Sequence, residues 1–468
     1  MSIKLSIKLS IRLPGLAALV ATLSLLPTTA CDIDVPDLNN PGIDDLAENP
    51  TRSSVSAACT GLLIGNRRNR AQANGYVAQL GIIGREAYNF DQADPRFIGE
   101  LLEGTLQAGS PFGGNFWAGP YANIRLANTV QRAVEKVAEF SPAEKAAILG
   151  FTKTVEATDL LEVAVTRDTI GGVIDTDRDL SQVLGPIVGK EQMFAEIVKQ
   201  LDEGAAALAM GGDEFPFALS SGYDGFDDPA GFATYNRAIR ARVAVYMKDY
   251  QAALTALQGS FIDDMVTSVA GLEAGVYHAY STGSGDQVNN LINPNLFAHL
   301  SFQMDVQMNG PDVDARYTRK TRTVTKAGGA QGLSSNLKYT RYSAPDSPVP
   351  IIRNEELLLL RAEARYFTGA IGGTTGAMSD LNLVRTLSGG LAPIPGSPAM
   401  AAFIDALLHE RRYSLAFEGH RWIDVRRFDR ITSLPVDMAD HVRNVRYPIP
   451  QAECNARAGE PSCDVGSL

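Results

Sequence analysis

Hydrophobic residues recur at intervals of three and four along most of the chain, the spacing that places them on one face of an α-helix. This pattern predicts helices near residues 51–65, 115–139, 142–165, 190–209, 231–247, 250–258, 352–368, 374–387, 400–417 and 420–429. One of these helices has a clear start signal. Ser141 fits the cap position, Pro142 the first helical position, and Glu144 completes a capping box. The sequence therefore predicts a mainly helical protein.

Some of the predicted helices are expected to pair. The run Arg242–Leu257, RVAVYMKDYQAALTAL, places small residues between large ones, as the helix pairs of tetratricopeptide repeats do. The segments Arg361–Gly369 and Ala377–Asn382 repeat this arrangement. The intervals between such pairs are irregular, so the pattern alone does not predict a solenoid.

Three long stretches lack helical periodicity. They span residues 82–114, 166–189 and 259–349, and they are rich in Gly, Asp, Asn and aromatic residues. Within the third stretch, short β-like runs are expected around Leu300–Gln307 and Thr318–Thr325. Long ordered loops on a helical domain usually carry function.

Charged and bulky apolar residues are interleaved most densely in Glu410–Arg427, ERRYSLAFEGHRWIDVRR. Gly419 is expected to end a helix here, because glycine tolerates a positive φ. Phe417, Trp422 and Phe428 stand beside the charges, which a fully solvated face would not require. From position 418 to 427, every third residue is charged: Glu418, Arg421, Asp424 and Arg427. On a helix, each carboxylate would therefore lie one turn from a guanidinium. We expect two helices joined by partly buried structural ion pairs, and no active site.

The first thirty residues are typical of an export signal. Lys4, Lys8 and Arg12 precede an apolar run, Leu13–Leu26, that is too short to span a membrane as a mature helix. The tetrapeptide Thr28–Cys31, TTAC, has the small residues of a lipidation site. We therefore expect a lipoprotein signal peptide over 1–30, lipidation of Cys31 and a lipidated tether over 31–50. The alternative is an ordinary signal peptide cleaved near Ala30.

The charge balance narrows the class of partner. Residues 1–30 hold three basic and no acidic residues, so without them the formal net charge changes from −11 to −14. An acidic chain argues against binding to nucleic acid and against electrostatic attachment to a membrane. No later apolar run reaches about 18 residues, so the lipid is the only membrane attachment expected.

The four cysteines are expected to have different roles. Cys31 would carry the lipid, and Cys59 lies in an apolar helical stretch, where a buried thiol is expected. Cys454 and Cys463 flank a short loop, and an exported protein permits a disulfide between them. The sequence has no CxxC pair and no His near these cysteines, so it does not favour a zinc site.

Several segments match part of a catalytic or metal-binding motif, but none matches a whole one. His409–Tyr413, HERRY, lacks the second His of a zinc protease motif, and Gly185–Glu191 lacks the spacing of a phosphate-binding loop. Asp32–Asn40 lacks the central Gly and final Glu of a calcium loop and is interpreted as tether. We expect no metal, no cofactor and no catalysis. A pair of glycosidase carboxylates is not visible in a sequence, because their separation is three-dimensional.

Glycan binding requires exposed aromatic rings beside hydrogen-bonding groups, because sugar rings have apolar faces edged by hydroxyls. Three loops have that composition, and their residues are the candidate ligand-binding set: Tyr88, Asn89, Phe90, Asp91, Tyr223, Asp224, Phe226, Tyr277 and Tyr280. The alternative for each ring is packing beneath its own loop. Trp117 and Trp422 have apolar neighbours and are assigned to packing.

The segment Glu410–Arg427 resembles the signature of the SusD/RagB family, E-R-R-x-E-L-x-F-E-G-x-R-W/F-x-D-L-x-R. The tail Tyr447–Glu453 resembles the Y-P-I-P-x-x-E that follows it. Ser414 stands where the family has Glu, which puts one ion pair in doubt, and Val425 stands where it has Leu. Pro350–Tyr366 is similar to the family helix P-I-x-R-x-x-E-x-L-L-x-R-A-E-A. Further similar segments follow the family order: Cys31–Pro36, Trp117–Asn128, Asp314–Arg316, Asn336–Tyr339 and Asp380–Arg385.

The resemblance implies a fold and a function. The fold would be mainly α, with tetratricopeptide-like helix pairs forming a curved scaffold, long irregular ligand-binding loops and minor β. Residues 51–468 would form one SusD-like domain, with the signature region at about 310–468. The function would be that of an outer-membrane lipoprotein, facing the cell exterior, which captures an oligosaccharide and delivers it to a TonB-dependent SusC-type transporter without catalysis.

Three alternatives remain open at this point. Some relatives handle peptides, so the ligand could be a peptide. The chain could also be an exported hydrolase on a helical scaffold, or a scaffold lipoprotein without a small ligand.

Overall fold

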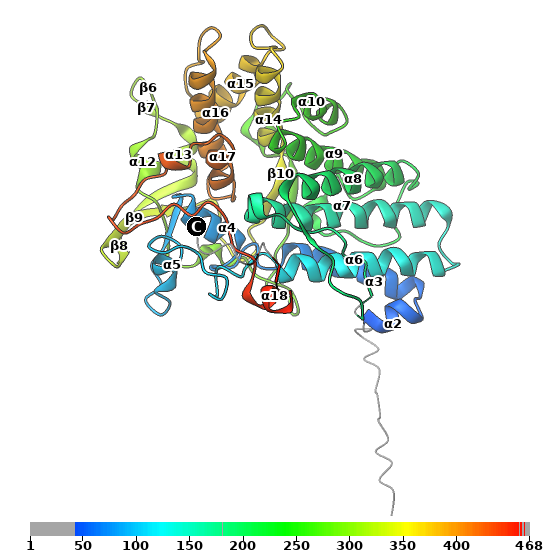
Figure 1. The fold of residues 1–468 in the computed structure, drawn as a ribbon. Helices are drawn as coiled ribbons and strands as arrows, with labels where there is room; N and C mark the ends of the chain where they lie inside the picture. The colour runs from blue at the N-terminus through cyan, green and yellow to red at the C-terminus, as the bar shows by residue number, and fades with distance from the viewer. Residues whose placement is uncertain (1–42, 180, 458, 461–462, 464–468) are drawn as a thin grey trace, which may run out of the picture. The chain divides into compact units, whose positions relative to one another are not determined.

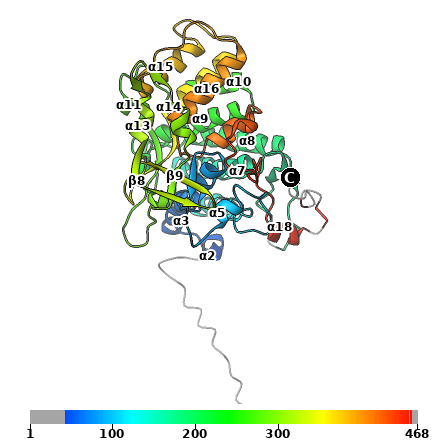
Figure 2. The same ribbon diagram turned by 90° about the vertical axis from the view of Figure 1, so that its left-hand side faces the viewer.

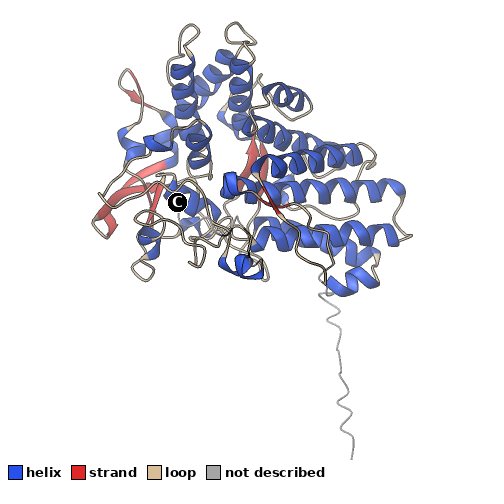
Figure 3. Cartoon of the chain, viewed as in Figure 1, coloured by secondary structure: helices blue, strands red, loops and turns tan. Residues whose placement is uncertain are grey.

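Helices are the main regular secondary structure of the chain in the computed structural model (Figures 1 and 3). The structure describes residues 43–468 apart from 180, 458, 461–462 and 464–468. Ile43–Leu468 forms one unit. The predicted signal peptide, Cys31 and the predicted tether up to residue 42 lie outside the described residues.

All ten predicted helices are present. Their bounds are α3 (Arg52–Arg67), α6 (Ala118–Lys136), α7 (Pro142–Arg167), α8 (Lys190–Leu208), α9 (Pro229–Tyr246), α10 (Tyr250–Gln258), α14 (Asn354–Phe367), α15 (Ala377–Gly389), α16 (Met400–Ser414) and α17 (Arg421–Arg427). The capping box of α7 forms as predicted. The Ser141 hydroxyl accepts the Glu144 N–H (3.2 Å), and the Glu144 carboxylate accepts the Ser141 N–H (2.8 Å).

Shorter helices were not predicted. They are α2 (Ile43–Glu48), α4 (Tyr76–Ile83), α5 (Arg96–Gly99), α11 (Val269–Glu273), α12 (Ser301–Met304), α13 (Ala315–Lys320) and α18 (Gln451–Ala456), with the single 3₁₀ turns η1 (Asp168–Ile170), η2 (Ser221–Tyr223), η3 (Asn290–Ile292) and η4 (Ile431–Ser433). All eight residues of α4 are buried, so it has no polar face from which to infer a helix. The predicted β run around Leu300–Gln307 is wrong, because that segment contains α12.

The main helices pack against one another in chain order. α6 lies against α7, α7 against α8, α8 against α9 and α9 against α10, and α14, α15 and α16 continue the series (Figure 1). The approach of α7 to α8 requires glycine. A Cβ added to Gly150 would lie 2.8 Å from the carbonyl oxygen of Gly204. Small residues at helix crossings are the feature that predicted tetratricopeptide-like pairs.

In the part of the chain that the structure describes, the strands form five antiparallel pairs, nearly all within the three stretches that lack helical periodicity. The pairs are β1 (Ala87–Asn89) with β5 (Leu296–Ala298), β2 (Gly172–Val173) with β3 (Ile187–Val188), β4 (Gly275–His278) with β10 (Val349–Arg353), β6 (Met308–Asn309) with β7 (Asp312–Val313), and β8 (Thr321–Ala330) with β9 (Leu333–Tyr339). Figure 2 shows the β8–β9 hairpin face-on. Its turn uses two positive φ angles, 49° at Gln331 and 81° at Gly332.

Both tryptophans lie in the interior, as predicted. Trp422 is fully buried, and its indole N–H donates to the carbonyl of Asn444 (2.7 Å). Trp117 is also buried and packs edge-on against Tyr121. Cys59 is a buried thiol, and burial raises its pKa. Cys454 and Cys463 are joined by a disulfide, which closes a loop next to α18.

Among the described residues, no helix combines the length and the apolar character needed to cross a membrane.

Candidate ligand-binding site

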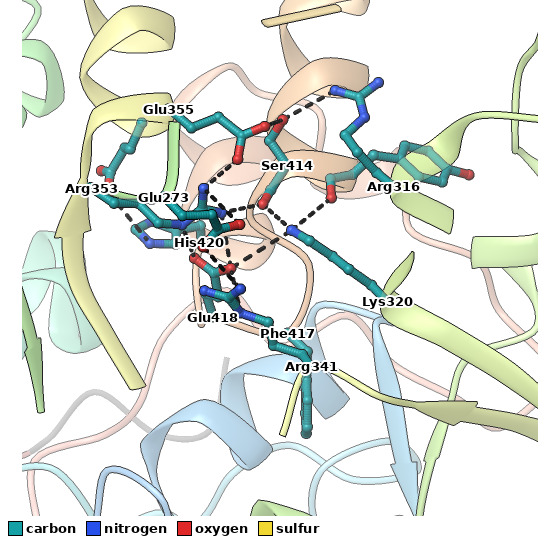
Figure 4. Close-up of polar contacts among 12 residues, drawn as sticks. Glu273, Arg316, Lys320, Arg341, Arg353, Glu355, Ser414, Phe417, Glu418 and His420 are labelled. Atoms are coloured by element: carbon teal, nitrogen blue, oxygen red, sulfur yellow. Dashed lines mark hydrogen bonds and ion pairs between the residues drawn. The ribbon is translucent and has the colours of Figure 1, made fainter. Parts of the chain in front are cut away.

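The junction between α16 and α17 is a tight turn that places a carboxylate in the interior. Phe417 has a φ of 58° and Gly419 a φ of 88°, on either side of Glu418. Gly419 adopts the positive φ that was predicted, although α16 already ends at Ser414. As a result the Glu418 side chain, 1% exposed, points into a buried cluster of charges (Figure 4).

Three cations converge on Glu418 from outside its own segment. Its Oε1 lies 3.0 Å from Arg353, 3.4 Å from Arg341 and 3.8 Å from Lys320. Burial alone would raise the pKa of the Glu418 carboxyl, but these cations together lower it below its usual value. Burial also lowers the pKa of Lys320, to about 8.

The predicted pairing of the signature charges is partly wrong. Arg421 does not lie against Glu418. It turns toward the β1 side of the molecule, where it donates to the carbonyl of Arg85 (3.4 Å). Burial, followed by the nearby Arg412, lowers the pKa of Arg421 to about 9. Asp424 and Arg427 do pair, at 3.0 Å. Spacing along the sequence identified the Asp424–Arg427 pair. It missed the partners of Glu418, which come from distant positions.

This cluster anchors the base of the β8–β9 hairpin. Lys320 immediately precedes β8, and its ammonium donates to the carbonyls of Tyr413 (3.1 Å) and Ser414. Arg341 follows β9 and bridges Glu418 to Glu273 (2.9 Å). Both ends of the hairpin are therefore fixed to the α16–α17 junction, and the hairpin can act as a rigid wall.

The wall encloses a groove of about 930 Å³, called here the hairpin groove. Its other sides are the segments 90–92 and 291–297, with Tyr342 and Phe417 at the floor. Phe90 lies against Phe297 with ring centroids 5.5 Å apart, and Tyr339 stacks on Phe417 at 4.6 Å. These four rings line the groove, and those of Phe90, Phe297 and Phe417 are largely buried. A groove of this volume suits a ligand of several rings.

The rim of the hairpin groove is polar and positively charged. Asn293 and Asn295 come from the loop before β5, and the exposed Arg322 and Lys326 come from β8. The Lys338 ammonium lies 3.6 Å from the centre of the Phe297 ring, and burial lowers its pKa to about 8. Amides, guanidinium and aromatic rings together can bind hydroxyl-rich molecules.

A second groove, of about 530 Å³, lies beside α3 and is called here the Arg67 groove. One wall is the α3 face with Leu63, Ile64 and Arg67, and the other sides are segments 218–223 and 278–286. Two of the three predicted loops meet here. A Cβ added to Gly222 would lie 1.9 Å from the carbonyl oxygen of Tyr277, so the two loops touch through backbone and require glycine at that point.

Residues 276–449 match the sequence model described as the SusD family. Over this segment the chain is similar to the SusD family. A search of curated proteins finds no match.

Solved structures of SusD proteins share the fold of this chain. A SusD superfamily protein from Bacteroides vulgatus is 14% identical and covers 86% of this chain and 97% of its own, with a TM-score of 0.67. A SusD-like carbohydrate-binding protein from Bacteroides fragilis is 16% identical (86% and 98%, TM-score 0.68). Surface glycan-binding protein A from Bacteroides thetaiotaomicron, in complex with laminarihexaose, is 15% identical (88% and 98%, TM-score 0.66).

Most of the rings chosen as exposed platforms are buried, and for them that expectation is wrong. Tyr88 stacks between Phe90 (5.1 Å) and His299 (4.7 Å). The predicted rings and amide that are buried are Tyr88, Asn89, Phe90, Tyr223 and Tyr280. The loops that carry these residues lie over apolar parts of the molecule. Their rings pack into that apolar surface and are buried there. The alternative of packing beneath the loop describes them correctly.

The remaining predicted residues are more exposed. Tyr277 is half-buried, and its hydroxyl donates to the carbonyl of Glu273. Phe226 is half-buried and packs edge-on against Phe261 (4.8 Å). Asp91 is half-buried and holds its own turn by accepting the Ala93 N–H (3.0 Å). Asp224 is exposed. None of these four residues lines either groove.

The structure brings the candidate residues together only in part. Phe90 lines the hairpin groove, and Tyr223 and Tyr280 line the Arg67 groove. The polar groove residues that the sequence did not indicate are Arg67, Asn293, Asn295, Arg322, Lys326 and Lys338. Arg67 follows the helical pattern of α3, and only its position in the last turn would have drawn attention to it.

A buried carboxyl beside the hairpin groove predicts a pH dependence. Glu86 accepts the Phe417 N–H (3.2 Å), and burial raises its pKa to about 7. The folded state therefore binds the proton more tightly than the unfolded chain does. Stability from this group is fully present below the unfolded pKa, about 4.3, and is lost as pH rises through 7.

We expect Glu86→Gln to reduce the loss of unfolding free energy between pH 4.5 and 8.5 by roughly 3 kcal/mol relative to the wild type. Urea unfolding at a series of pH values measures this difference. Equal slopes for the wild type and the variant would show that Glu86 does not bind the proton in the folded state.

Proposed function

We propose that this chain is a surface glycan-binding lipoprotein that holds an oligosaccharide in the hairpin groove and passes it intact to a TonB-dependent SusC-type transporter. The observation that carries the proposal is the groove itself. It has a volume of about 930 Å³, a wall anchored by buried ion pairs, aromatic rings among its lining residues, and amides and guanidinium at its rim. These are the groups that recognise a sugar by its faces and hydroxyls.

The comparisons support a glycan as the ligand. Two proteins of the same fold bear names that refer to carbohydrate or glycan binding, and one was solved with laminarihexaose. The SusC-type partner is proposed from the similarity of residues 276–449 to the SusD family. The acidic net charge fits a sugar ligand better than a nucleic acid, because it repels phosphate backbones.

The position of the protein in the cell is proposed from its N-terminal sequence. Residues 1–30 would direct export and Cys31 would carry the lipid. The tether would be shorter than the predicted 31–50, because α2 (Ile43–Glu48) already packs against α6 as part of the domain. This arrangement would hold the groove at the outer membrane facing the exterior.

The proposal predicts that groove residues control glycan affinity. In calorimetric titration of the mature chain, we expect Asn295→Ala combined with Arg322→Ala to lower the affinity for a bound oligosaccharide at least about 10-fold, equivalent to about 1.4 kcal/mol. The variant removes an amide and a guanidinium from the rim of the groove, and both side chains lie at its surface.

Lys199→Ala is the matched control, because Lys199 is an exposed cation on α8 and lies outside the groove. It should leave the affinity unchanged. Tight binding of peptides with no binding of any glycan would favour a peptide-binding protein. Release of cleaved sugars, lost on replacing one carboxylate, would favour a hydrolase.

A further inference from the structure

Arg67 is incompletely paired at the centre of the Arg67 groove. Its side chain is 11% exposed. One terminal nitrogen donates to the carbonyl of Ala279 and the other to the carboxylate of Asp286. The Nε–H is buried and has no hydrogen-bond partner in the described part of the chain. A buried donor without a partner costs about 1–3 kcal/mol, and in a native structure such a group often marks a place that a water or ligand completes.

Asp286 is a weakly held partner. It lies on the segment 281–287, and its side chain is 30% exposed. Gly283 and Gly285 stand in the same segment, and Gly285 has a φ of 84° with open space around its Cα. Ion pairs that reach solvent contribute only about 0.2–1 kcal/mol. The Asp286 carboxylate also accepts the Gln287 N–H (2.7 Å), but that bond lies within its own segment and can move with it when the carboxylate leaves Arg67.

The present pairing also leaves the stronger geometry of Arg67 unused. A carboxylate binds guanidinium best when its two oxygens accept two parallel N–H bonds. Asp286 engages only one terminal nitrogen, while the adjacent Nε–H stays unpaired. A carboxylate that replaced Asp286 and engaged both nitrogens would gain one charge-assisted hydrogen bond.

The walls around Arg67 suit a sugar ring. Leu63, Leu219 and the 37% exposed Ile64 give an apolar surface, which matches the C–H face of a sugar. Ser220, Ser221 and Ser284 line the same groove with hydroxyls. The Tyr280 ring lies 5.7 Å from the Arg67 guanidinium carbon, and its buried hydroxyl makes no hydrogen bond with the described residues.

We propose that the Arg67 groove binds a carboxylate-bearing sugar, such as a uronic acid residue of an oligosaccharide, and that Asp286 occupies the position of the ligand carboxylate when the groove is empty. The inference rests on the proposed function and adds a second site, for an acidic residue of a glycan. The ligand carboxylate replaces Asp286 on Arg67, engages the Nε–H as well, and displaces the segment 281–287. No covalent bond changes.

The test is calorimetric titration of the mature chain with trimers of galacturonic and glucuronic acid, each compared with its neutral, carboxyl-reduced counterpart. At least one acidic trimer should bind at least about 10-fold more tightly than its neutral form. Asp286→Asn removes the competing charge and should raise affinity for that trimer at least about 5-fold. Arg67→Gln should lower it at least about 10-fold.

Arg68→Gln is the matched control, because Arg68 is the next residue, is exposed and does not line the groove. It should change neither affinity. Asp286→Asn alters an exposed loop, so its thermal unfolding should match that of the wild type and its result does not depend on the folding of Arg67→Gln.

Equal affinities for acidic and neutral trimers, or an Asp286→Asn variant that binds the acidic trimer no better than the wild type, would overturn the inference. Neutral glycans that still bind in the hairpin groove in that case would leave the proposed function intact. If the wild type binds no glycan at all, both the further inference and the proposed function are contradicted.

Discussion

Glu418→Gln should lower the free energy of unfolding by about 3–5 kcal/mol, because it removes one charge from a buried group and leaves its partners in place. The variant has nearly the same shape, so packing is preserved. Arg353, Arg341 and Lys320 would then face a neutral amide in the interior. Urea unfolding followed by circular dichroism measures the loss.

The same variant should loosen the hairpin that walls the groove. Lys320 and Arg341 hold its two ends to Glu418, so amide hydrogen exchange in β8 and β9 should accelerate more than exchange in α7 and α8. The control is Asp202→Asn, which removes a carboxylate that pairs with Arg237 and Arg240 at the surface. That change should cost less than about 1 kcal/mol.

A loss below about 1 kcal/mol for Glu418→Gln, or unchanged exchange in the hairpin, would contradict the anchoring role of the cluster.

Ser414→Glu, which restores the residue usual in the SusD family signature, should destabilise this chain by about 3 kcal/mol or more. Ser414 is fully buried. Its hydroxyl donates to Glu355 (2.6 Å) and accepts from Arg316 (3.1 Å), as Figure 4 shows. Glu355 itself pairs with Arg353. A second carboxylate at position 414 would therefore be buried against the first.

Glu355 already supplies a buried carboxylate beside position 414. It stands at a position where the family helix pattern specifies no residue, while the adjacent Glu356 fills the specified one. Burial would raise the pKa of Glu355, but Arg353 and Lys320 hold it well below the usual value, so the carboxylate is charged. We infer that the buried negative charge has moved from position 414 to position 355.

A double-mutant cycle tests this exchange. Glu355→Ala alone should destabilise the chain, because Arg353 loses a partner. When Glu355→Ala is combined with Ser414→Glu, the loss of unfolding free energy should be at least about 2 kcal/mol smaller than the sum of the two single losses. The new carboxylate then has space and cations to pair with. Additive losses, or a neutral effect of Ser414→Glu, would show that the two positions do not substitute for each other.

The sequence predicted the long helices because their signals are local. The cap at Ser141 and the amphipathic spacing of α3 or α7 involve residues within a few turns of one another. α4 escaped detection because it is buried on all sides and has no polar face. The segment 300–307 was misassigned because a short apolar run has no period long enough to separate strand from helix.

The site was predicted less well for a related reason. Glu418 takes its partners from positions 320, 341 and 353, and no spacing rule within Glu410–Arg427 could name them. The loops around Tyr88, Tyr223 and Tyr277 had the composition of a sugar site, but composition does not tell which way a ring points. Tyr88 and Tyr223 turn inward, and the grooves are edged by amides and guanidinium groups from residues without a distinctive motif.

The most direct test of the account is a crystal structure of the mature chain with an oligosaccharide that it binds in solution. The account predicts continuous density for an intact glycan in the hairpin groove, in contact with Asn295 and Arg322. A glycan seated away from both grooves, or one found cleaved after incubation with the protein alone, would contradict it.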